Sequence, residues 1–281
     1  MDQHLEQIRE QQKETWNRFS PGWQKWDDFT MEWLKPMGDA IIRSLNLKDT
    51  DIVLDVAAGT GEPGLTIATL VNKGKVVITD LADGMLEVAR GNATKKGIRN
   101  YEMVACDVCE LPFSDETFDA ISCRFGFMFF PDMLMAAKEM IRVLKPGGKM
   151  AASVWSVPDK NDWITVTMGT INKNMELPAP PAGAPGMFRS GSPGFLVDLF
   201  RQAGFKNISE KEITGTLNSG SNDRYWSFVN EVAAPVVAAM NKADDPMREK
   251  IKKEVFELLD RKYPDKKAAV DYGAVVVCGE K

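Results

Sequence analysis

Between residues 51 and 156 the sequence alternates short apolar runs with amphipathic stretches, and no other feature constrains the fold as strongly. The runs DIVLDVAA (51–58), KVVITD (75–80) and FDAISCRF (118–125) are mostly apolar. Apolar strands separated by helices are typical of a parallel sheet with helices on both faces. Such a sheet binds its ligand at the carboxyl ends of its strands. We therefore predict an α/β, doubly wound sheet with a site at that edge.

The segments on both sides of this region are predicted to cover the sheet. Residues 1–46 repeat aromatic side chains at spacings of three and four, which is typical of helices, and SPG at 20–22 predicts a break between two of them. We expect residues 1–46 to form a helical lid. Residues 47–281 are expected to form one domain, with cap insertions at about 157–192 and 218–266.

The later part of the chain is less regular. Its pattern predicts a loop at 176–194, a helix at 194–205, a strand at 206–217, two helices within 222–262 and a closing strand at 268–280. Helices inserted between the last two strands would cover the carboxyl edge of the sheet.

Charge and cysteine content narrow the function classes. With 35 Lys+Arg against 40 Asp+Glu, the chain has no overall basic field, so nucleic acid is not an expected partner. The N-terminus is polar, and no stretch has the roughly 20 apolar residues of a membrane span. The four cysteines lack a metal-site or disulfide spacing, so no metal is expected. We expect a cytoplasmic monomer or homodimer.

The turn after the first apolar run, VLDVAAGTGEPG, suits a cationic ligand. Gly59, Gly61 and Gly64 form the pattern G-x-G-x-x-G, which is shared by dinucleotide sites. Asp55 and Glu62 lie in or beside this turn, and their charges would repel a diphosphate. S-adenosylmethionine (SAM) carries a sulfonium and an ammonium group and has no phosphate, so the acids favour it.

Acids also end the next two predicted strands. Asp80 ends VVITD, where a carboxylate can accept hydrogen bonds from ribose hydroxyls, although dinucleotide sites share this feature. Asp107 ends VACDV and can accept from an adenine amino group, with Val108 on one face of the ring and Met85 on the other.

Five ordered motifs together resemble the class I SAM-dependent methyltransferases, most closely the UbiE/COQ5-like (methyltransferase type 11) group. The resemblance covers about residues 47–156 and implies a Rossmann-like seven-stranded sheet whose last strand is antiparallel. The motifs are VLDVAAGTGEPG, VVITDLADGML, ACDVCELPFSDETFDAI, FGFMFFPD and MIRVLKPGG. The cofactor residues then expected are Asp55, Ala57, Gly59, Thr60, Gly61, Asp80, Leu81, Met85, Asp107, Val108, Arg124 and Phe125.

The reaction expected is an in-line transfer of the methyl group to a small, apolar or aromatic acceptor, with S-adenosylhomocysteine as product. Candidate proton acceptors are Asp27, Asp28, Asp162 and Tyr225. Candidate acceptor-binding residues are Trp16, Trp23, Trp26, Phe129, Trp163, Phe188, Arg189 and Trp226.

Two alternatives stay open on the sequence. An NAD(P)-dependent oxidoreductase would use the same glycine turn, although no Y-x-x-x-K follows the fourth strand. A protein that binds SAM without transferring its methyl group would carry the same motifs.

Overall fold

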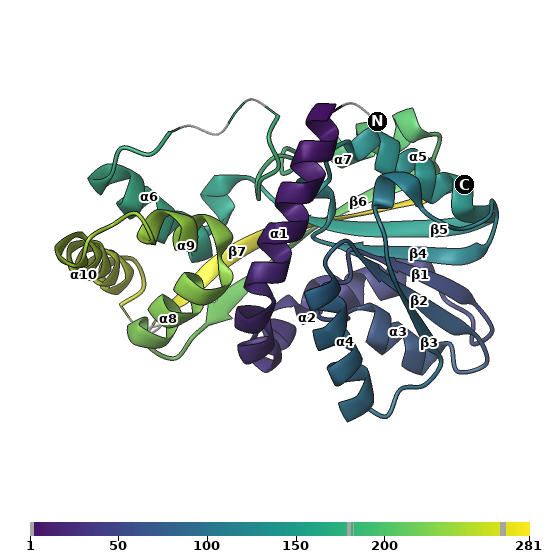
Figure 1. The fold of residues 1–281 in the computed structure, drawn as a ribbon, viewed down its shortest axis with the longest axis horizontal. Helices are drawn as coiled ribbons and strands as arrows, with labels where there is room; N and C mark the ends of the chain where they lie inside the picture. Colours follow the sequence, from purple (N-terminus) through teal and green to yellow (C-terminus); the bar gives the residue numbers. More distant parts are fainter. Residues whose placement is uncertain (1–2, 179–180, 182, 265–267) are drawn as a thin grey trace.

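The computed structural model describes residues 3–178, 181, 183–264 and 268–281, and in this part of the chain the core is one seven-stranded sheet (Figure 1). The strands lie in the order β3-β2-β1-β4-β5-β7-β6. Strand β7 runs antiparallel to both of its neighbours, β5 and β6, and the other strand pairs are parallel, so the expected fold class is confirmed. The strands are β1 (Ile52–Val56), β2 (Lys75–Asp80), β3 (Tyr101–Ala105), β4 (Phe118–Arg124), β5 (Leu144–Trp155), β6 (Lys206–Asn218) and β7 (Ala269–Glu280).

Helices cover both faces of the sheet because successive strand residues point to opposite sides. Val53 and Ala120 pack with α3 and the C-terminal half of α2, whereas Leu54 and Ile121 pack with α5 and α7. These layers leave the carboxyl ends of β1, β2, β4 and β5 at one edge. The helices that belong to them are α2 (Asp27–Leu45), α3 (Gly64–Leu70), α4 (Asp83–Lys95), α5 (Met133–Val143) and α7 (Phe195–Ala203).

A helical cap stands beside the sheet, and α1 (Gln3–Lys25) crosses between the two (Figure 1). Asn17 of α1 accepts a hydrogen bond from the backbone N–H of Gly84 on α4 (2.9 Å). At the other end of α1, Lys25 pairs with Glu231 of α8 (2.6 Å). Helix α1 therefore connects α4, beside the sheet, to the cap. The cap helices are α6 (Asp162–Asn174), α8 (Asn222–Val232), α9 (Ala234–Met240) and α10 (Asp245–Lys262).

Two expected helix boundaries were wrong. Helix α1 continues through Pro21, and the break before α2 falls at Trp26. A Cβ on Gly22 would lie 2.4 Å from the carbonyl oxygen of Glu231, so close packing on α8 fixes this part of α1 and overrides the local Pro-Gly signal. The segment 222–262 forms three helices, because a short helix that begins at Ala234 with Pro235 in its first turn separates α8 from α10.

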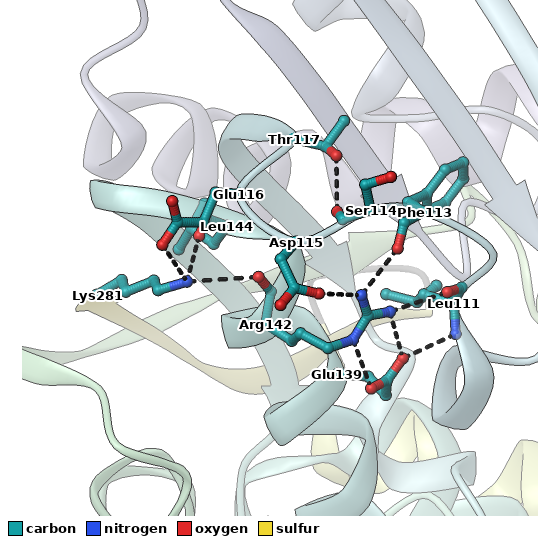
Figure 2. A network of polar contacts seen from close by, with 10 residues as sticks. All are labelled: Leu111, Phe113, Ser114, Asp115, Glu116, Thr117, Glu139, Arg142, Leu144 and Lys281. Carbon is teal, nitrogen blue, oxygen red and sulfur yellow. Dashed lines mark hydrogen bonds and ion pairs between the residues drawn. The ribbon is translucent and has the colours of Figure 1, made fainter.

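A polar network fixes the connection from β3 to β4 (Figure 2). Arg142 of α5 donates to the carbonyl oxygens of Leu111 (3.0 Å) and Phe113 (2.8 Å) and pairs with Asp115 and Glu139. The network holds the end of the short helix η1 (Val108–Glu110), whose first residue reaches the carboxyl edge of the sheet.

No described helix is long and apolar enough to cross a membrane.

Candidate functional site

A cavity opens at the carboxyl edge of the sheet, under α1 and against the start of α9. One half is lined by the glycine-rich turn and the ends of β2, β3 and β4, and we call it the nucleotide half. Its residues are Gln12, Val56–Thr60, Glu62, Thr79–Leu81, Met85, Cys106–Val108 and Arg124. The other is called the aromatic half and comprises Trp16, Trp23, Trp33, Leu34, Phe125, Gly126, Met128–Pro131, Trp155, Trp163, Met187 and Val232–Pro235.

The glycine-rich turn has a backbone that few side chains tolerate. Gly59 and Gly61 have φ of +57° and +108°, in the left-handed region that glycine enters freely. Gly61 is also crowded, because a Cβ there would lie 2.7 Å from Leu65 Cδ1. These two glycines thus allow a tight turn whose backbone lies at the cavity.

Asp80 ties this turn to the end of β2. The backbone N–H of Gly59 donates to Asp80 Oδ2 and that of Ala82 to Oδ1, both at 2.9 Å. Burial raises the pKa of Asp80, and these backbone donors oppose the rise. Each carboxylate oxygen can still accept a second hydrogen bond, so Asp80 can receive ligand hydroxyls.

Asp55 lies beneath the turn and does not line the cavity. Its side chain is fully buried, accepting from the backbone N–H of Gly64 (2.9 Å) and from Ser122 Oγ (2.6 Å). Burial raises the pKa of Asp55 to about 7, against the effect of these two donors. The structure therefore places Asp55 as a support of the turn, away from ligand contact.

Arg124, at the end of β4, is the cation of the nucleotide half. Its Nη2 lies 3.5 Å from Met31 Sδ, and no ion pair within 4 Å joins it to an acid of the described chain. Burial lowers the pKa of this guanidinium, and Glu62, Asp55 and Asp27 oppose the effect. Glu62 itself pairs with Lys96. Arg124 is thus available to an anionic ligand group.

The adenine-binding residues expected from the sequence gather at the ends of β2 and β3. Met85 is 2% exposed and Val108 8%, and both line the cavity beside Asp107. Asp107 Oδ1 accepts from the backbone N–H of Cys109 (2.9 Å). Its Oδ2 is buried without a hydrogen-bond partner, with Arg9 Nη1 at 3.9 Å. One carboxylate oxygen therefore remains for a donor from the ligand.

Stacked rings form the aromatic half. Phe125 stacks on Trp155 with ring centroids 4.2 Å apart, and Trp33 stacks on the same Trp155 at 5.3 Å. Trp163 meets Trp33 edge-on at 4.6 Å. Strand β5 supplies Trp155 and three covering segments supply the other rings, so the wall depends on tertiary packing. Flat rings at fixed spacing suit a planar apolar ligand.

None of the four candidate proton acceptors lines the cavity. Asp28 is exposed, and Asp27 accepts from Asn92 Nδ2 (3.0 Å) while burial raises its pKa. Asp162 pairs with Lys262 (2.6 Å) and accepts from Tyr263. Tyr225 is fully buried and donates to the carbonyl oxygen of Trp163 (2.9 Å). Each therefore has a place in the folded structure outside the cavity.

Half of the candidate acceptor-binding residues line the cavity. Trp16, Trp23, Phe129 and Trp163 line the cavity, and Trp26, Phe188, Arg189 and Trp226 do not. The indole of Trp26 donates to Glu231 Oε2 (2.9 Å), and Arg189 donates to the carbonyl oxygen of Phe130 (2.6 Å). The side chain of Trp26 thus binds α8, and that of Arg189 binds the loop at Phe130.

Sequence reasoning assigned no ligand-binding role to two large residues of the cavity wall, Trp33 and Trp155. Trp155 ends the fifth strand, the position at which ligands of such sheets bind, and that rule could have found it. Trp33 lies in the helical aromatic stripe of residues 1–46, where periodicity gives a buried face but not its partner.

The cavity holds one thiol, Cys106. Burial, with Asp107 and Asp80 nearby, raises its pKa to about 12, so it stays protonated at neutral pH. All four cysteines are free, and the described residues contain no cluster of His, Cys, Asp and Glu that could hold a metal ion.

Curated sequences with known names match the core of this chain. The UbiE ubiquinone/menaquinone biosynthesis C-methyltransferase of Teredinibacter turnerae is 42% identical over 113 residues, which is 40% of this chain and 45% of the relative. The demethylmenaquinone methyltransferase of Staphylococcus carnosus is 30% identical over 191 residues, covering 62% of this chain and 76% of the relative. The chain spans about half the length of the first of these relatives.

Solved structures share the fold at low sequence identity. The YcgJ protein of Bacillus subtilis aligns with a TM-score of 0.56 and 19% identity, covering 87% of this chain and 97% of that one. The [4+2]-cyclase SpnF aligns at 0.54 with 20% identity, covering 88% and 80%. Phosphoethanolamine N-methyltransferase 2 of Haemonchus contortus, solved with SAM, aligns at 0.53 with 17% identity, covering 88% and 52%.

A family model described as the ubiE/COQ5 methyltransferase family matches residues 24–166, which include the glycine-rich turn, the acids that end β2 and β3, and most of the aromatic wall. The chain belongs to the ubiE/COQ5 methyltransferase family.

Proposed function

We propose that this protein is a SAM-dependent methyltransferase whose acceptor is a small planar aromatic molecule. The observation that carries the proposal is the continuity of one cavity. Its nucleotide half offers Asp80, Asp107 and Arg124 beside a glycine-rich turn, and its other half is a wall of stacked rings. A polar cofactor and an apolar acceptor can therefore meet at the boundary between the halves.

The nucleotide half offers partners for the ribose, the adenine and the carboxylate of SAM. Asp80 has lone pairs free for ribose hydroxyls, and Asp107 Oδ2 is a buried acceptor without a hydrogen-bond partner. Arg124 would pair with the cofactor carboxylate, since no carboxylate of the described chain lies within salt-bridge distance of it. Burying a cation without a partner is unfavourable, so a ligand anion there stabilises the site.

When bound, SAM supplies an electrophilic methyl group on a sulfonium. The chain contributes orientation and exclusion of water, since transfer is an in-line displacement. Phe125, at the end of β4, has φ of +62°, which places its ring on Trp155 at the boundary between the halves. These rings would hold an acceptor in line with the methyl group.

The aromatic half contains no carboxylate, amine, imidazole or thiol among the residues that the structure describes. An acceptor would therefore reach the site with a free lone pair, or as a hydroxyl that has lost its proton to water and can react at its oxygen or at a carbon of its ring. An acidic aromatic hydroxyl meets this requirement. The names of the UbiE and demethylmenaquinone relatives support a quinone-type aromatic acceptor.

Calorimetry with SAM and with NADH tests the cofactor assignment. Binding of SAM with no binding of NADH supports the proposal, and the reverse result would mean an oxidoreductase. The reaction is tested by S-adenosylhomocysteine formation with reduced naphthoquinones as acceptors. SAM binding without turnover on any acceptor would favour a non-catalytic protein or different chemistry on this fold, and the SpnF neighbour shows that the fold also occurs in a cyclase.

A further inference from the structure

Two tryptophans of the aromatic half have buried indole N–H groups without a partner. They are Trp23 on α1 and Trp33 on α2, and both side chains line the cavity. Trp33 is only 6% exposed. Two other indoles of the lid and cap are paired: Trp26 donates to Glu231 Oε2 (2.9 Å), and Trp163 donates to Asn161 Oδ1 (3.2 Å). In the described part of the chain, buried indole N–H groups without a partner thus occur at Trp23 and Trp33 alone.

An unpaired buried N–H costs stability, and folded proteins satisfy nearly all such groups. A phenylalanine in place of Trp33 would keep the stacking on Trp155 and remove that cost. The unpaired donor therefore suggests a partner that arrives with the ligand. Because the neighbouring side chains of the aromatic half are apolar or paired, that partner belongs to the molecule that fills this half.

We propose that Trp33, assisted by Trp23, donates its indole N–H to an oxygen of the methyl acceptor and so selects acceptors that carry a carbonyl or hydroxyl on an aromatic ring. This inference rests on the proposed function. It adds a specificity-determining residue to it. Donors from two different helices suit an acceptor with more than one oxygen. Such a site discriminates strongly between acceptors with and without the oxygen, because an analogue that lacks it leaves the buried indole N–H unpaired.

The position of Trp33 is fixed well enough for this role. Its ring stacks on Trp155 at 5.3 Å with an interplanar angle of 22°, and Phe228 and Tyr272 meet it edge-on at 5.7 and 6.1 Å. Locked side chains on helices and strands hold a donor more accurately than loops do. Trp163 shares this environment and is a matched control, since its N–H is already paired within the protein.

The test compares Trp33→Phe with Trp163→Phe, using 1-naphthol and naphthalene as probes in equilibrium dialysis with S-adenosylhomocysteine present. The wild type should bind 1-naphthol more tightly than naphthalene. Trp33→Phe should weaken 1-naphthol binding at least fivefold and leave naphthalene within twofold. Trp163→Phe should change both affinities by the same factor. Trp23→Phe gives a second reading of the same preference if Trp33→Phe does not fold, and cofactor affinity within twofold of wild type shows that a variant is folded.

The proposal is overturned if Trp33→Phe and Trp23→Phe leave 1-naphthol binding unchanged, or if both probes lose affinity equally. An equal loss would mean that Trp33 contributes to acceptor binding through packing alone. Failure of the wild type to bind 1-naphthol also overturns it. Failure of the proposed function is separate: it appears as absent SAM binding or absent methyl transfer in the wild type, with the probe preferences unaffected.

Discussion

Asp55 Oδ1 and Ser122 Oγ lie 2.6 Å apart at a fully buried junction between β1 and β4. The other carboxylate oxygen of Asp55 accepts from the backbone N–H of Gly64, at the start of α3. One side chain thus joins two neighbouring strands to the helix that follows the glycine-rich turn. A Cβ on Gly64 would lie 2.6 Å from Asp55 Oδ2, so the glycine permits this close contact.

Stability should fall as pH rises because of Asp55. Burial raises the pKa of Asp55 from 3.8 to about 7 in the folded protein. The protonated carboxyl therefore contributes its full stabilisation at a pH below 3.8, the pKa in the unfolded chain, and this contribution is lost as pH rises through about 7. Asp55→Asn cannot ionise and can keep both contacts, because its amide oxygen can accept from Gly64 N–H while its NH2 donates to Ser122 Oγ. Between pH 4 and pH 8, the free energy of unfolding of the wild type should fall relative to Asp55→Asn by on the order of a few kcal/mol.

Urea denaturation of both proteins at several pH values measures this difference. Parallel pH profiles for the two proteins would contradict it. Ser122→Ala is a useful companion, because it removes one donor to the carboxylate and should increase the pH sensitivity.

The sequence predicts the sheet well and the walls of the cavity only in part. Strand positions follow from local apolar runs, and the acid that ends β2 lies in the cavity as its motif suggests. The role of Asp55 could not be read in the same way, because a motif does not show that Ser122, 67 positions away, takes up its oxygen. Trp33 and Trp155 were missed because only the packing of α2 on β5 brings them together.

The same reasoning explains the wrong helix break. The Pro-Gly pair at residues 21 and 22 is a local signal, and the contact of Gly22 with Glu231 is a tertiary one. Local signals therefore located the parts that the chain forms by itself. In the lid and cap they predicted helices correctly but misplaced helix boundaries, because contacts with distant segments decide where those helices end.

Replacing Asp80 should weaken SAM binding. Asp80→Ala removes the acceptor proposed for ribose hydroxyls and leaves Gly59 N–H without its partner, which should cost about 1–3 kcal/mol, or roughly 5- to 150-fold in affinity. Calorimetry measures the change. Asp83→Ala is the matched control, since its side chain is 67% exposed and pairs only loosely with Lys13 at 3.5 Å. Equal affinities for Asp80→Ala and wild type would remove Asp80 from the site.

The two glycines of the turn should differ in what they tolerate. A Cβ at Gly61 would meet Leu65 Cδ1 at 2.7 Å and Ala89 Cβ at 3.2 Å, whereas none of the described atoms lies within 4 Å of a Cβ at Gly59. Gly61→Ala should therefore lower the free energy of unfolding by about 1–3 kcal/mol. Gly59→Ala should cost about 1 kcal/mol through backbone strain, and Ala57 already adopts a φ of +52°. Thermal denaturation measures which of the two variants loses more stability. A larger loss of stability for Gly59→Ala would contradict the geometry.

Replacing Arg142 should destabilise the fold more than replacing the exposed arginine Arg201. It donates to two backbone carbonyls and pairs with Asp115 and Glu139, and its hydrogen bonds to Glu139 lower the pKa of that carboxyl (Figure 2). Arg142→Ala leaves these acceptors to water and should lower the free energy of unfolding by about 2 kcal/mol. Arg201→Ala breaks an exposed pair with Asp198 and should change it by less than about 0.5 kcal/mol. Because Arg142 fixes the segment that carries Val108, its loss should also weaken SAM binding, and equal stability of the two variants would contradict the assignment.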